Sequence, residues 1–371
     1  MNPPAQKTIV IAAGGTGGHF FPAEALAAEL LSRGERVVLM TDARSGGLNS
    51  PVFAQAERHV LAGAGLSGRS LKRAVSGAVA LAQGIMQARK LMRQLRPAAV
   101  VAFGGYPAVP PVLAARLLSA RPKLVLHEQN AVLGRANRLL ARCADFLVLS
   151  FAKTKAVPAG IATDVLGNPV RPAIAALHAG GFVPPQGRIE LLVLGGSLGA
   201  KIFGTLIPAA LALLPAELRA RLHVVQQCRL QELEEARAAF TTAGIDAELS
   251  PFFADVEERL RRAHLVIARA GASTVAEIAV VGRPAIFIPL PNAIDDHQRA
   301  NAEALAEQNA AWVAPQTGLT PQALAARIES VLMDTETLKM AADRAGEAGR
   351  PDAALQLAET VLRMVAEQVR S

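Results

Sequence analysis

The segment Ile9–His19 reads IVIAAGGTGGH, an apolar run that leads into two glycine pairs. The same pattern returns as VVAFGGYP at Val100–Pro107 and as LLVLGGSLGA at Leu191–Ala200. A buried strand followed by glycines and a helix places backbone N–H groups at the helix start, where they face an anionic ligand. The sequence therefore predicts strand, glycine loop and helix units suited to phosphate groups in both halves of the chain.

Short apolar runs alternate with Ala- and Leu-rich stretches along all 371 residues. Strands are expected at residues 8–12, 36–41, 99–103, 123–127 and 146–150, and again at 190–194, 222–226, 265–268, 285–289 and 311–313. Such alternation is typical of parallel sheets covered on both faces, so the predicted class is α/β with two doubly wound, Rossmann-like domains.

Turn-rich sequence at residues 167–172 and glycine- and proline-rich sequence at 178–188 indicate a domain boundary. We expect an N-terminal domain over residues 1–172 and a C-terminal domain over 173–351. Residues 352–370 form an amphipathic pattern and predict a last helix, whose docking partner these residues alone leave open.

Composition excludes several classes of protein. A hydrophobic content of 51% with 19% charged residues excludes a disordered chain, and two cysteines exclude a disulfide scaffold, as expected for a reducing cytoplasm. The longest uncharged stretch, residues 97–115, contains prolines and a glycine pair, so we do not expect it to span a membrane. Aromatic residues make up only 4% and no nucleic-acid-binding motif appears, so no nucleic acid partner is predicted.

The net charge of +8 is unevenly placed, because no acidic residue occurs between Glu57 and Glu128. The first half is therefore expected to meet an anionic partner. Within this interval, residues 71–95 predict a helix with basic residues near both ends. Its apolar positions are Ala78, Leu81, Ile85, Met92 and Leu95. Such a helix either lies on an anionic membrane surface or packs on the domain with solvated ends.

The first glycine loop fits a dinucleotide-binding pattern only in part, because Phe20 stands where the third glycine belongs. Asp42 follows the second strand, where an NAD enzyme would hold ribose, so a dehydrogenase is one alternative. His19 falls at a helix start, whose partial positive charge favours a neutral imidazole able to act as a base. An ordinary structural histidine is the other interpretation.

Three further polar stretches follow predicted strands. HEQN at residues 127–130 indicates either a site at a strand end or a capped loop. RAGASTVAE at 269–277 places Glu277 one turn into a helix, where it would accept ribose hydroxyls or belong to a capping box. DDHQRAN at 295–301 contains two acids and a histidine but no second ligand cluster, so no metal is predicted and Gln298 is favoured as an amide that contacts a sugar or base.

Taken together, the motifs resemble those of the MurG family, the N-acetylglucosaminyltransferases of peptidoglycan synthesis. The resemblance covers nearly the whole chain. It rests on GGTGGHFFP (14–22), FGGYP (103–107), HEQN (127–130), GNPVR (167–171), GGSLGA (195–200), RAGASTVAEI (269–278) and DDHQRANA (295–302). It implies a glycosyltransferase B fold, with two domains facing across a cleft and the last helix packed back on the first domain.

The resemblance also implies residue roles. UDP-GlcNAc, the donor, is expected at Thr16, Gly17, Gly18, Asn130, Arg171, Ser197, Phe253, Ala272, Ser273, Thr274, Val275, Ala276, Glu277 and Gln298. Asn130 would face the transferred sugar, Arg171 and Ser197 the diphosphate, the backbone of Phe253 the uracil, Glu277 the ribose and Gln298 the sugar hydroxyls. Leu198 replaces a glutamine usual in the third loop, and Val132-Leu133 precedes a glycine where the family has a Pro-Gly or Ala-Gly pair.

The acceptor that the resemblance implies is a lipid-linked muramyl-pentapeptide diphosphate, expected at Gly104, Gly105 and Tyr106. The reaction is an inverting, metal-independent transfer with no cofactor, and His19 or Glu128 is the candidate base. The expected place is the cytoplasmic face of the bacterial inner membrane, as a peripheral protein, with other cell-wall synthesis proteins as partners. The alternatives are an epimerase or another transferase of the same fold that uses UDP-GlcNAc, a dehydrogenase and a non-enzymatic membrane scaffold.

Overall fold

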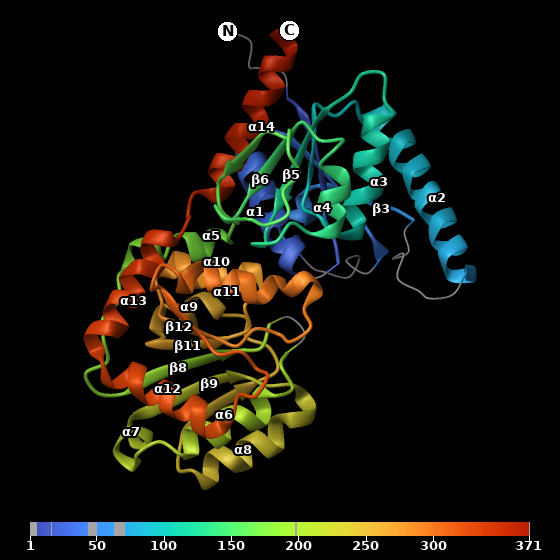
Figure 1. Cartoon of the computed structure of the whole chain (residues 1–371). Helices are drawn as coiled ribbons and strands as arrows, with labels where there is room; N and C mark the ends of the chain where they lie inside the picture. Colours follow the sequence, from blue (N-terminus) through green and yellow to red (C-terminus); the bar gives the residue numbers. More distant parts are fainter. Residues whose placement is uncertain (1–5, 16, 44–49, 63–70, 197–198, 371) are drawn as a thin grey trace. The chain divides into compact units, whose positions relative to one another are not determined.

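The structure is a computed structural model that describes residues 6–15, 17–43, 50–62, 71–196 and 199–370. The chain forms two compact units (Figure 1). Unit 1 comprises Met1–Arg171 together with Asp352–Ser371, and unit 2 comprises Pro172–Pro351. Each unit is built around its own parallel sheet.

The sheet of unit 1 has, within the described residues, seven strands in the order β3-β2-β1-β4-β5-β6-β7, and every pair is parallel. The strands are β1 (Thr8–Ala12), β2 (Arg36–Thr41), β3 (Glu57–Val60), β4 (Ala99–Ala102), β5 (Lys123–Glu128), β6 (Phe146–Leu149) and β7 (Thr163–Val165). The strand order reverses between β1 and β4, and in open α/β sheets ligands bind beyond the carboxyl ends of the strands at such a point.

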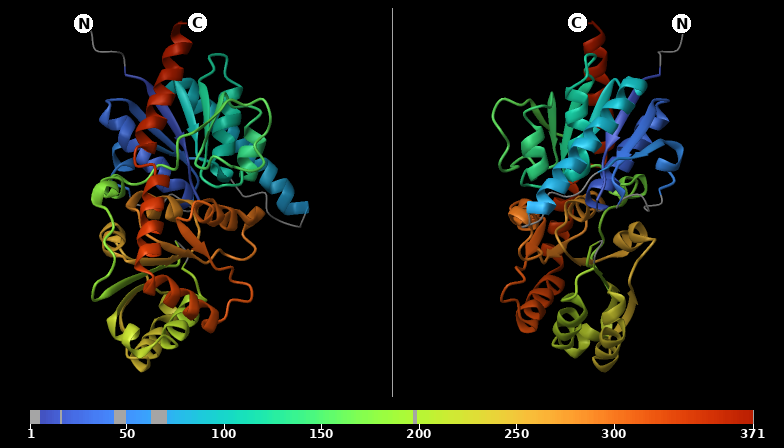
Figure 2. Two further views of the ribbon diagram at one scale, coloured as in Figure 1. Left: turned by 60° about the vertical axis from the view of Figure 1, so that its left-hand side comes forward. Right: turned by 90° about the vertical axis from the view of Figure 1, so that its right-hand side faces the viewer.

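Two layers of helices cover this sheet. The helices are α1 (Gly17–Ser32), α2 (Leu71–Leu95), α3 (Gly105–Arg116), α4 (Arg135–Leu140) and α14 (Ala353–Arg370), with a short 3-10 helix η2 (Phe53–Gln55). Helices α1 and α14 lie side by side on one face, where Leu26 and Val361 share a core (Figure 2). Helices α2, α3 and α4 cover the other face, where Met92 and Val112 are buried.

Unit 2 has a similar architecture. Its sheet has the strand order β10-β9-β8-β11-β12-β13, and within the described residues every pair of neighbouring strands is parallel. The strands are β8 (Ile189–Leu194), β9 (Leu222–Gln227), β10 (Asp246–Ser250), β11 (Leu265–Ala268), β12 (Ala285–Phe287) and β13 (Ala311–Val313). The order reverses between β8 and β11, so a second site is expected beyond the carboxyl ends of these two strands.

The helices of unit 2 cover both faces of this sheet (Figure 1). The α-helices are α5 (Pro172–Ala175), α6 (Phe203–Ala212), α7 (Ala216–Arg221), α8 (Leu233–Thr242), α9 (Val256–Arg262), α10 (Ala272–Val281), α11 (His297–Ala306), α12 (Pro321–Met333) and α13 (Thr335–Ala348). The 3-10 helices are η3 (His178–Gly180), η4 (Leu230–Glu232) and η5 (Ile294–Asp296). Helices α6, α7, α8 and α12 enclose one buried core around Phe203 and Phe240.

The structure confirms the ten predicted strands to within about two residues at each end, and it confirms the helix over 71–95. It adds three strands that the sequence analysis missed, β3, β7 and β10, each of which is an edge strand of its sheet. The uncharged stretch 97–115 contains β4 and all of α3 except its last residue, Arg116. Among the described helices, none is long and apolar enough to cross a membrane.

Candidate functional site

In unit 1, the loops after β1, β4 and β5 converge at the carboxyl edge of the sheet. His19 lies in the first turn of α1, and its Nδ1 is 2.9 Å from Oε1 of Gln129, which follows β5. The opposite edge of the His19 ring faces the loop after β4. If Gly105 carried a Cβ atom, that atom would lie 3.4 Å from His19 Nε2. The two residues are therefore neighbours, and His19 is held from one side by Gln129.

Glu128, the other candidate base, is only 1% exposed and accepts four hydrogen bonds from the loop that follows it and from α4. Its Oε1 accepts from the backbone N and the side-chain Nδ2 of Asn130 at 3.0 and 3.1 Å. Its Oε2 accepts from the backbone N of Gly134 at 2.8 Å and from Nδ2 of Asn137 at 2.9 Å. These bonds occupy the lone pairs that a base needs, so the geometry favours His19 as the base and Glu128 as the organiser of the loop.

The loop after β4 requires glycine at both positions of its pair. Gly104 and Gly105 have φ of +80° and +67°, a region that side chains disfavour. A Cβ on Gly104 would also lie 3.1 Å from Nδ2 of Asn137, the amide that holds Glu128. The loop starts α3, and half-buried Tyr106 lies in its first turn. The three predicted acceptor residues therefore stand at a helix start beside His19.

The first glycine loop and the GNPVR turn also meet within unit 1. The guanidinium of Arg171 lies over the ring of Phe21 in α1, 5.9 Å from its centroid. A Cβ on Gly17, where α1 begins, would lie 2.7 Å from Phe21. Gly17 and Gly18 are half-buried at the helix start. A cationic side chain therefore accompanies the partial positive charge of this helix end. Thr16 lies outside the described residues.

In unit 2, the loop after β8 turns sharply. A Cβ on Gly195 would lie 2.6 Å from the backbone N of Ala200, so only glycine fits without displacing the backbone. Gly196 and Gly199 have positive φ. Ser197, and Leu198 beside it, lie outside the described residues.

The loop after β11 leads directly into α10, with Gly271 as its N-cap. Residues Ala272 through Glu277 are the first six of this ten-residue helix, so the free backbone N–H groups of its first turn face outward from the sheet edge. Ser273 Oγ is buried here and has no hydrogen-bond partner. Buried hydroxyls are nearly always paired, so this one is suited to a ligand.

Buried polar groups tie these loops of unit 2 together. Arg269 is 7% exposed, stacks on Phe203 and donates from Nη1 to the carbonyls of Ile288 and Pro289 at 2.9 and 3.1 Å. Burial lowers its pKa. Asn301 in α11 donates to the carbonyl of Ala270 at 3.0 Å. The ends of β11 and β12 are thus fixed relative to each other.

Gln298 lies in the first turn of α11 and is half-buried. Its Oε1 accepts a hydrogen bond from the backbone N of Leu290 at 3.0 Å, which directs its amide into the loop after β12. Three residues near this loop, Asn292, Asp295 and Asp296, have positive φ. Non-glycine residues in this conformation cluster at functional sites, where the surrounding structure holds them in place.

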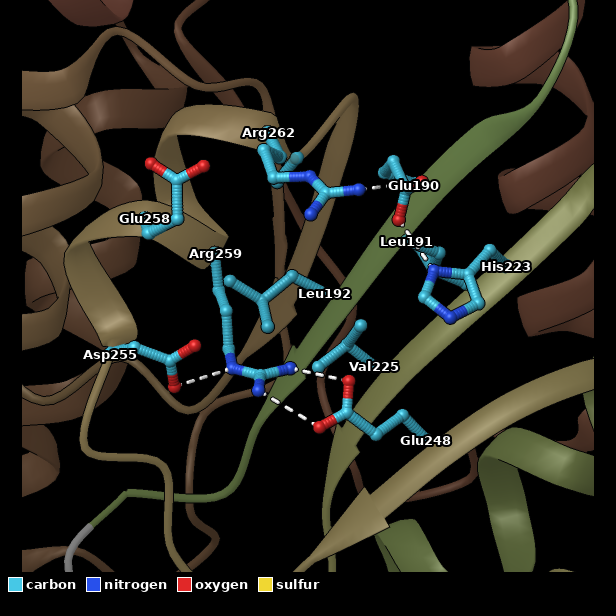
Figure 3. A pocket seen from close by; sticks show the side chains of 11 residues that line it. Glu190, Leu191, Leu192, His223, Val225, Glu248, Asp255, Glu258, Arg259 and Arg262 are labelled. Atoms are coloured by element: carbon cyan, nitrogen blue, oxygen red, sulfur yellow. Dashed lines mark hydrogen bonds and ion pairs between the residues drawn. The ribbon is translucent and has the colours of Figure 1, made fainter.

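Phe253 follows β10 and is 5% exposed. Arg259 of α9 stacks on its ring at 4.1 Å and donates to Glu248 from both Nη atoms at 2.8 Å. Figure 3 shows these charged side chains around a pocket on the face of the sheet next to α9, where Glu190 also meets His223 at 2.6 Å. Arg259 therefore pairs with Glu248 and also covers the Phe253 ring, and this arrangement supports the Phe253 loop.

A further surface feature of unit 1 lies on α2. Val75, Val79 and Met86 of α2 are 58%, 51% and 63% exposed. Their spacing of four and seven residues places them on one face of the helix. Lys90 and Arg93 continue that face and line a shallow hollow with Met86. The structure therefore separates this exposed stripe from the predicted apolar face, whose Leu81, Ile85, Met92 and Leu95 pack on the core. Ala78, the fifth predicted position, is exposed, so the prediction was wrong for that residue.

Sequence analysis did not single out Gln129, Asn137, Arg269 or Asn301 individually. Each is polar and buried at the end of a strand or in the helix that follows it. Their only signal is that polar residues interrupt apolar sequence beside a glycine loop. Within the described ranges, no group of three or more His, Cys, Asp or Glu side chains is placed to hold a metal ion.

Comparison with known proteins agrees with this architecture. Residues 9–148 match the glycosyltransferase family 28 N-terminal domain and residues 190–357 match the glycosyltransferase family 28 C-terminal domain. The chain belongs to this family of glycosyltransferases, and its two parallel-sheet domains have the glycosyltransferase B fold.

Its relatives are more specific. The UDP-N-acetylglucosamine--N-acetylmuramyl-(pentapeptide) pyrophosphoryl-undecaprenol N-acetylglucosamine transferase of Granulibacter bethesdensis is 57% identical over 359 residues, 96% of this chain and 94% of its own. The protein of the same name from Acidiphilium cryptum is 56% identical and covers 98% of both chains. These similarities confirm the resemblance to the MurG family inferred from the seven motifs.

Solved structures show the same relationship. The crystal structure of MurG from Acinetobacter baumannii is 31% identical, with a TM-score of 0.78 over 96% of this chain and 99% of that one. A UDP-GlcNAc 2-epimerase from Neisseria meningitidis has a TM-score of 0.69 over 96% of this chain and all of its own, at 12% identity. The second likeness shows the fold alone.

Proposed function

We propose that this chain transfers N-acetylglucosamine from UDP-GlcNAc to the 4-hydroxyl of undecaprenyl-diphospho-N-acetylmuramyl-pentapeptide, a step of peptidoglycan synthesis. The observation that carries the proposal is the 57% identity, over nearly the whole of both chains, to a transferase named for this donor and acceptor. The glycine loops and the polar groups at the carboxyl edges of both sheets are the parts of this chain that such a reaction uses.

Unit 2 is assigned most of the contacts to the nucleotide. The start of α10 offers backbone N–H groups and the unpaired Ser273 hydroxyl to the diphosphate, and Glu277 accepts from the ribose. The loop after β12 presents Gln298 to the sugar hydroxyls, and the backbone beside Phe253 pairs with the uracil. Thr274, Val275 and Ala276 complete the helix turn, and Ser197 is assigned to the diphosphate from the motif alone.

We assign the binding of the acceptor and the catalytic base to unit 1. Gly104, Gly105 and Tyr106 contribute the start of α3, whose partial positive charge suits the acceptor diphosphate. Thr16, Gly17, Gly18 and Asn130 are assigned to the donor from the motifs. His19, beside Gly105, takes the proton from the acceptor hydroxyl as its oxygen attacks the anomeric carbon.

The attack displaces UDP in a single step, so an α-linked donor gives a β-1,4 product. The leaving diphosphate gains negative charge in the transition state. Arg171, lying over Phe21, and the helix starts after the glycine loops supply fixed positive potential for it. We therefore infer that the reaction proceeds without a metal ion or other cofactor.

The acceptor is lipid-linked, so the protein must reach a membrane surface. The exposed stripe of Val75, Val79 and Met86 with Lys90 and Arg93 is suited to anionic lipid, because apolar side chains enter the headgroup region while cations meet its charge. We infer peripheral association with the cytoplasmic face of the bacterial inner membrane through this stripe. Contacts with other cell-wall synthesis proteins are part of the same proposal.

The test uses UDP-GlcNAc labelled in the sugar, incubated with the protein in EDTA, with and without the lipid-linked muramyl-pentapeptide acceptor. The expected result is UDP release that depends on the acceptor, with label in the lipid. Conversion to UDP-N-acetylmannosamine without acceptor would instead identify an epimerase, and failure to bind UDP-GlcNAc would refute the proposal.

A further inference from the structure

Hydrogen bonds through Gln129 and His127 connect His19 to the backbone carbonyl of Gly167. His127 Nε2 is 3.0 Å from the carbonyl oxygen of Gly167. The Gln129 amide nitrogen is 3.1 Å from His127 Nδ1 and 3.2 Å from the His127 carbonyl oxygen. The Gln129 amide oxygen is 2.9 Å from His19 Nδ1. The connection joins the GNPVR turn to the first turn of α1.

The chemistry of the groups fixes the direction of every bond. A carbonyl oxygen only accepts, so the bond to Gly167 requires a proton on His127 Nε2, and neutral His127 then accepts at Nδ1. The carbonyl of His127 likewise requires the amide nitrogen of Gln129 to face it. The Gln129 oxygen is therefore turned to His19, and it accepts a proton from Nδ1.

Burial keeps this arrangement intact. His127 is 0% exposed and Gln129 is 1% exposed, so water does not compete for their hydrogen bonds. Burial lowers the pKa of His127 to about 4, so its ring stays neutral and carries a single proton at neutral pH. Phe103 packs 5.1 Å from the His127 ring, centroid to centroid, and restricts its rotation.

From this geometry we infer that Gln129 and His127 are positioning residues that hold His19 in the tautomer protonated at Nδ1. The inference deepens the proposed function and rests on it. Protonation at Nδ1 leaves the lone pair on Nε2, the ring nitrogen that lies against Gly105. His19 then takes the acceptor hydroxyl proton at Nε2 as the new C–O bond forms and the bond to UDP breaks. The Gln129 oxygen stabilises the resulting imidazolium, which later gives its proton to solvent.

The tautomer is measured without turnover. The protein is labelled with ¹⁵N-histidine, and long-range ¹H–¹⁵N spectra distinguish a protonated from an unprotonated ring nitrogen. The His19→Asn variant assigns His19 among the seven histidines. The expected result for the neutral ring is a protonated Nδ1 and an unprotonated Nε2. A protonated Nε2 on neutral His19 would overturn the inference.

Variants at Gln129 connect the tautomer to the reaction. Gln129→Leu removes the oxygen, so we expect Nε2 protonation to appear and kcat to fall by about 10²-fold, with KM for UDP-GlcNAc changed less than about twofold. Gln129→Glu keeps an oxygen opposite Nδ1, so we expect it to retain the Nδ1-protonated form of His19, while the loss of the amide donor to His127 lowers stability. Gln55→Leu, at an exposed position of the same unit, serves as the matched control.

If Gln129→Leu keeps the wild-type tautomer and kcat, the positioning role is refuted while the transferase proposal stands. If the wild-type protein transfers no sugar, the proposed function fails, and the spectra still decide whether Gln129 sets the tautomer.

Discussion

Replacing Glu128 by glutamine separates its two candidate roles. The carboxylate accepts four hydrogen bonds, from Asn130 through two nitrogens, from Gly134 and from Asn137. A glutamine amide offers one oxygen and one NH₂ group, so it can accept from only one pair of donors. Its NH₂ group opposes the other pair.

The expected loss of loop stability follows from the two N–H donors that no longer have an acceptor. A buried donor left unpaired costs about 1–3 kcal/mol, so we expect Glu128→Gln to destabilise the loop by about 2–6 kcal/mol. A loss of about 2 kcal/mol already raises the open population about 30-fold. Hydrogen exchange followed by mass spectrometry should therefore show at least that fold loss of protection at the backbone amides of Asn130 and Gly134.

The matched control is Glu359→Gln, which removes an exposed carboxylate of unit 1 that meets Arg33 at 3.3 Å. A surface pair contributes little, so its protection pattern should match the wild type. The single tryptophan, Trp312, lies in β13 of unit 2, and its fluorescence follows that unit separately. Wild-type protection in Glu128→Gln together with a large loss of kcat would refute the structural role and restore Glu128 as the base.

Three other outcomes are expected. The pKa of His127 is about 4 in the folded protein and 6.5 when unperturbed, so unfolding takes up a proton between these values. The free energy of unfolding should fall by about 3 kcal/mol as pH drops from about 6.5 to about 4, and His127→Gln should remove this dependence in denaturant titrations. Arg283 donates to the carbonyls of residues 181, 260, 261 and 282, and burial lowers its pKa to about 10. Arg283→Leu should lower the stability of unit 2, read from tryptophan fluorescence, by about 3 kcal/mol. Val79→Glu with Met86→Glu should reduce sedimentation with anionic vesicles about tenfold or more, because two apolar side chains no longer enter the lipid.

Two of these outcomes have a control variant that changes the same chemistry elsewhere. For Arg283 it is Arg344→Leu, since that arginine is 54% exposed and pairs only at the surface. For the α2 stripe it is Met333→Glu, at a 66% exposed position of unit 2. Equal effects of variant and control would contradict the assigned role in either case. For His127, the assigned role would be contradicted if the free energy of unfolding of His127→Gln depended on pH as it does in the wild type.

The interior of the fold was predictable because interior strands carry their own signal. Residues such as Ile9 and Val266 belong to strands buried on both faces, and they stand in uninterrupted apolar runs. The missed strands β3, β7 and β10 read ERHV, TDV and DAELS, and all of their residues are exposed or half-buried. Strands at a sheet margin pair with few neighbours and need no apolar run, so tertiary pairing alone defines them.

The site was predictable as a set of loops but not as a set of contacts. The glycine pairs indicate sharp turns from a strand into a helix, and these motifs lie at the strand ends where sequence analysis placed them. The contacts between these residues could not be predicted from the sequence, because His19 and Gln129 are 110 residues apart and meet only in the folded sheet. The same limit applies to α2, where sequence analysis identified one apolar face and only packing shows that Val75, Val79 and Met86 form a second, exposed stripe.

The central claim is that this chain carries out acceptor-dependent, inverting sugar transfer with His19 as the base. The most direct measurement is a single-turnover reaction of UDP-GlcNAc with the lipid-linked muramyl-pentapeptide acceptor, for the wild type and for His19→Asn. We expect one UDP released per β-1,4-linked N-acetylglucosamine in the wild type, and a rate at least about 10²-fold lower in the variant at unchanged donor affinity. An α-linked product, or a His19→Asn rate equal to that of the wild type, would contradict this account.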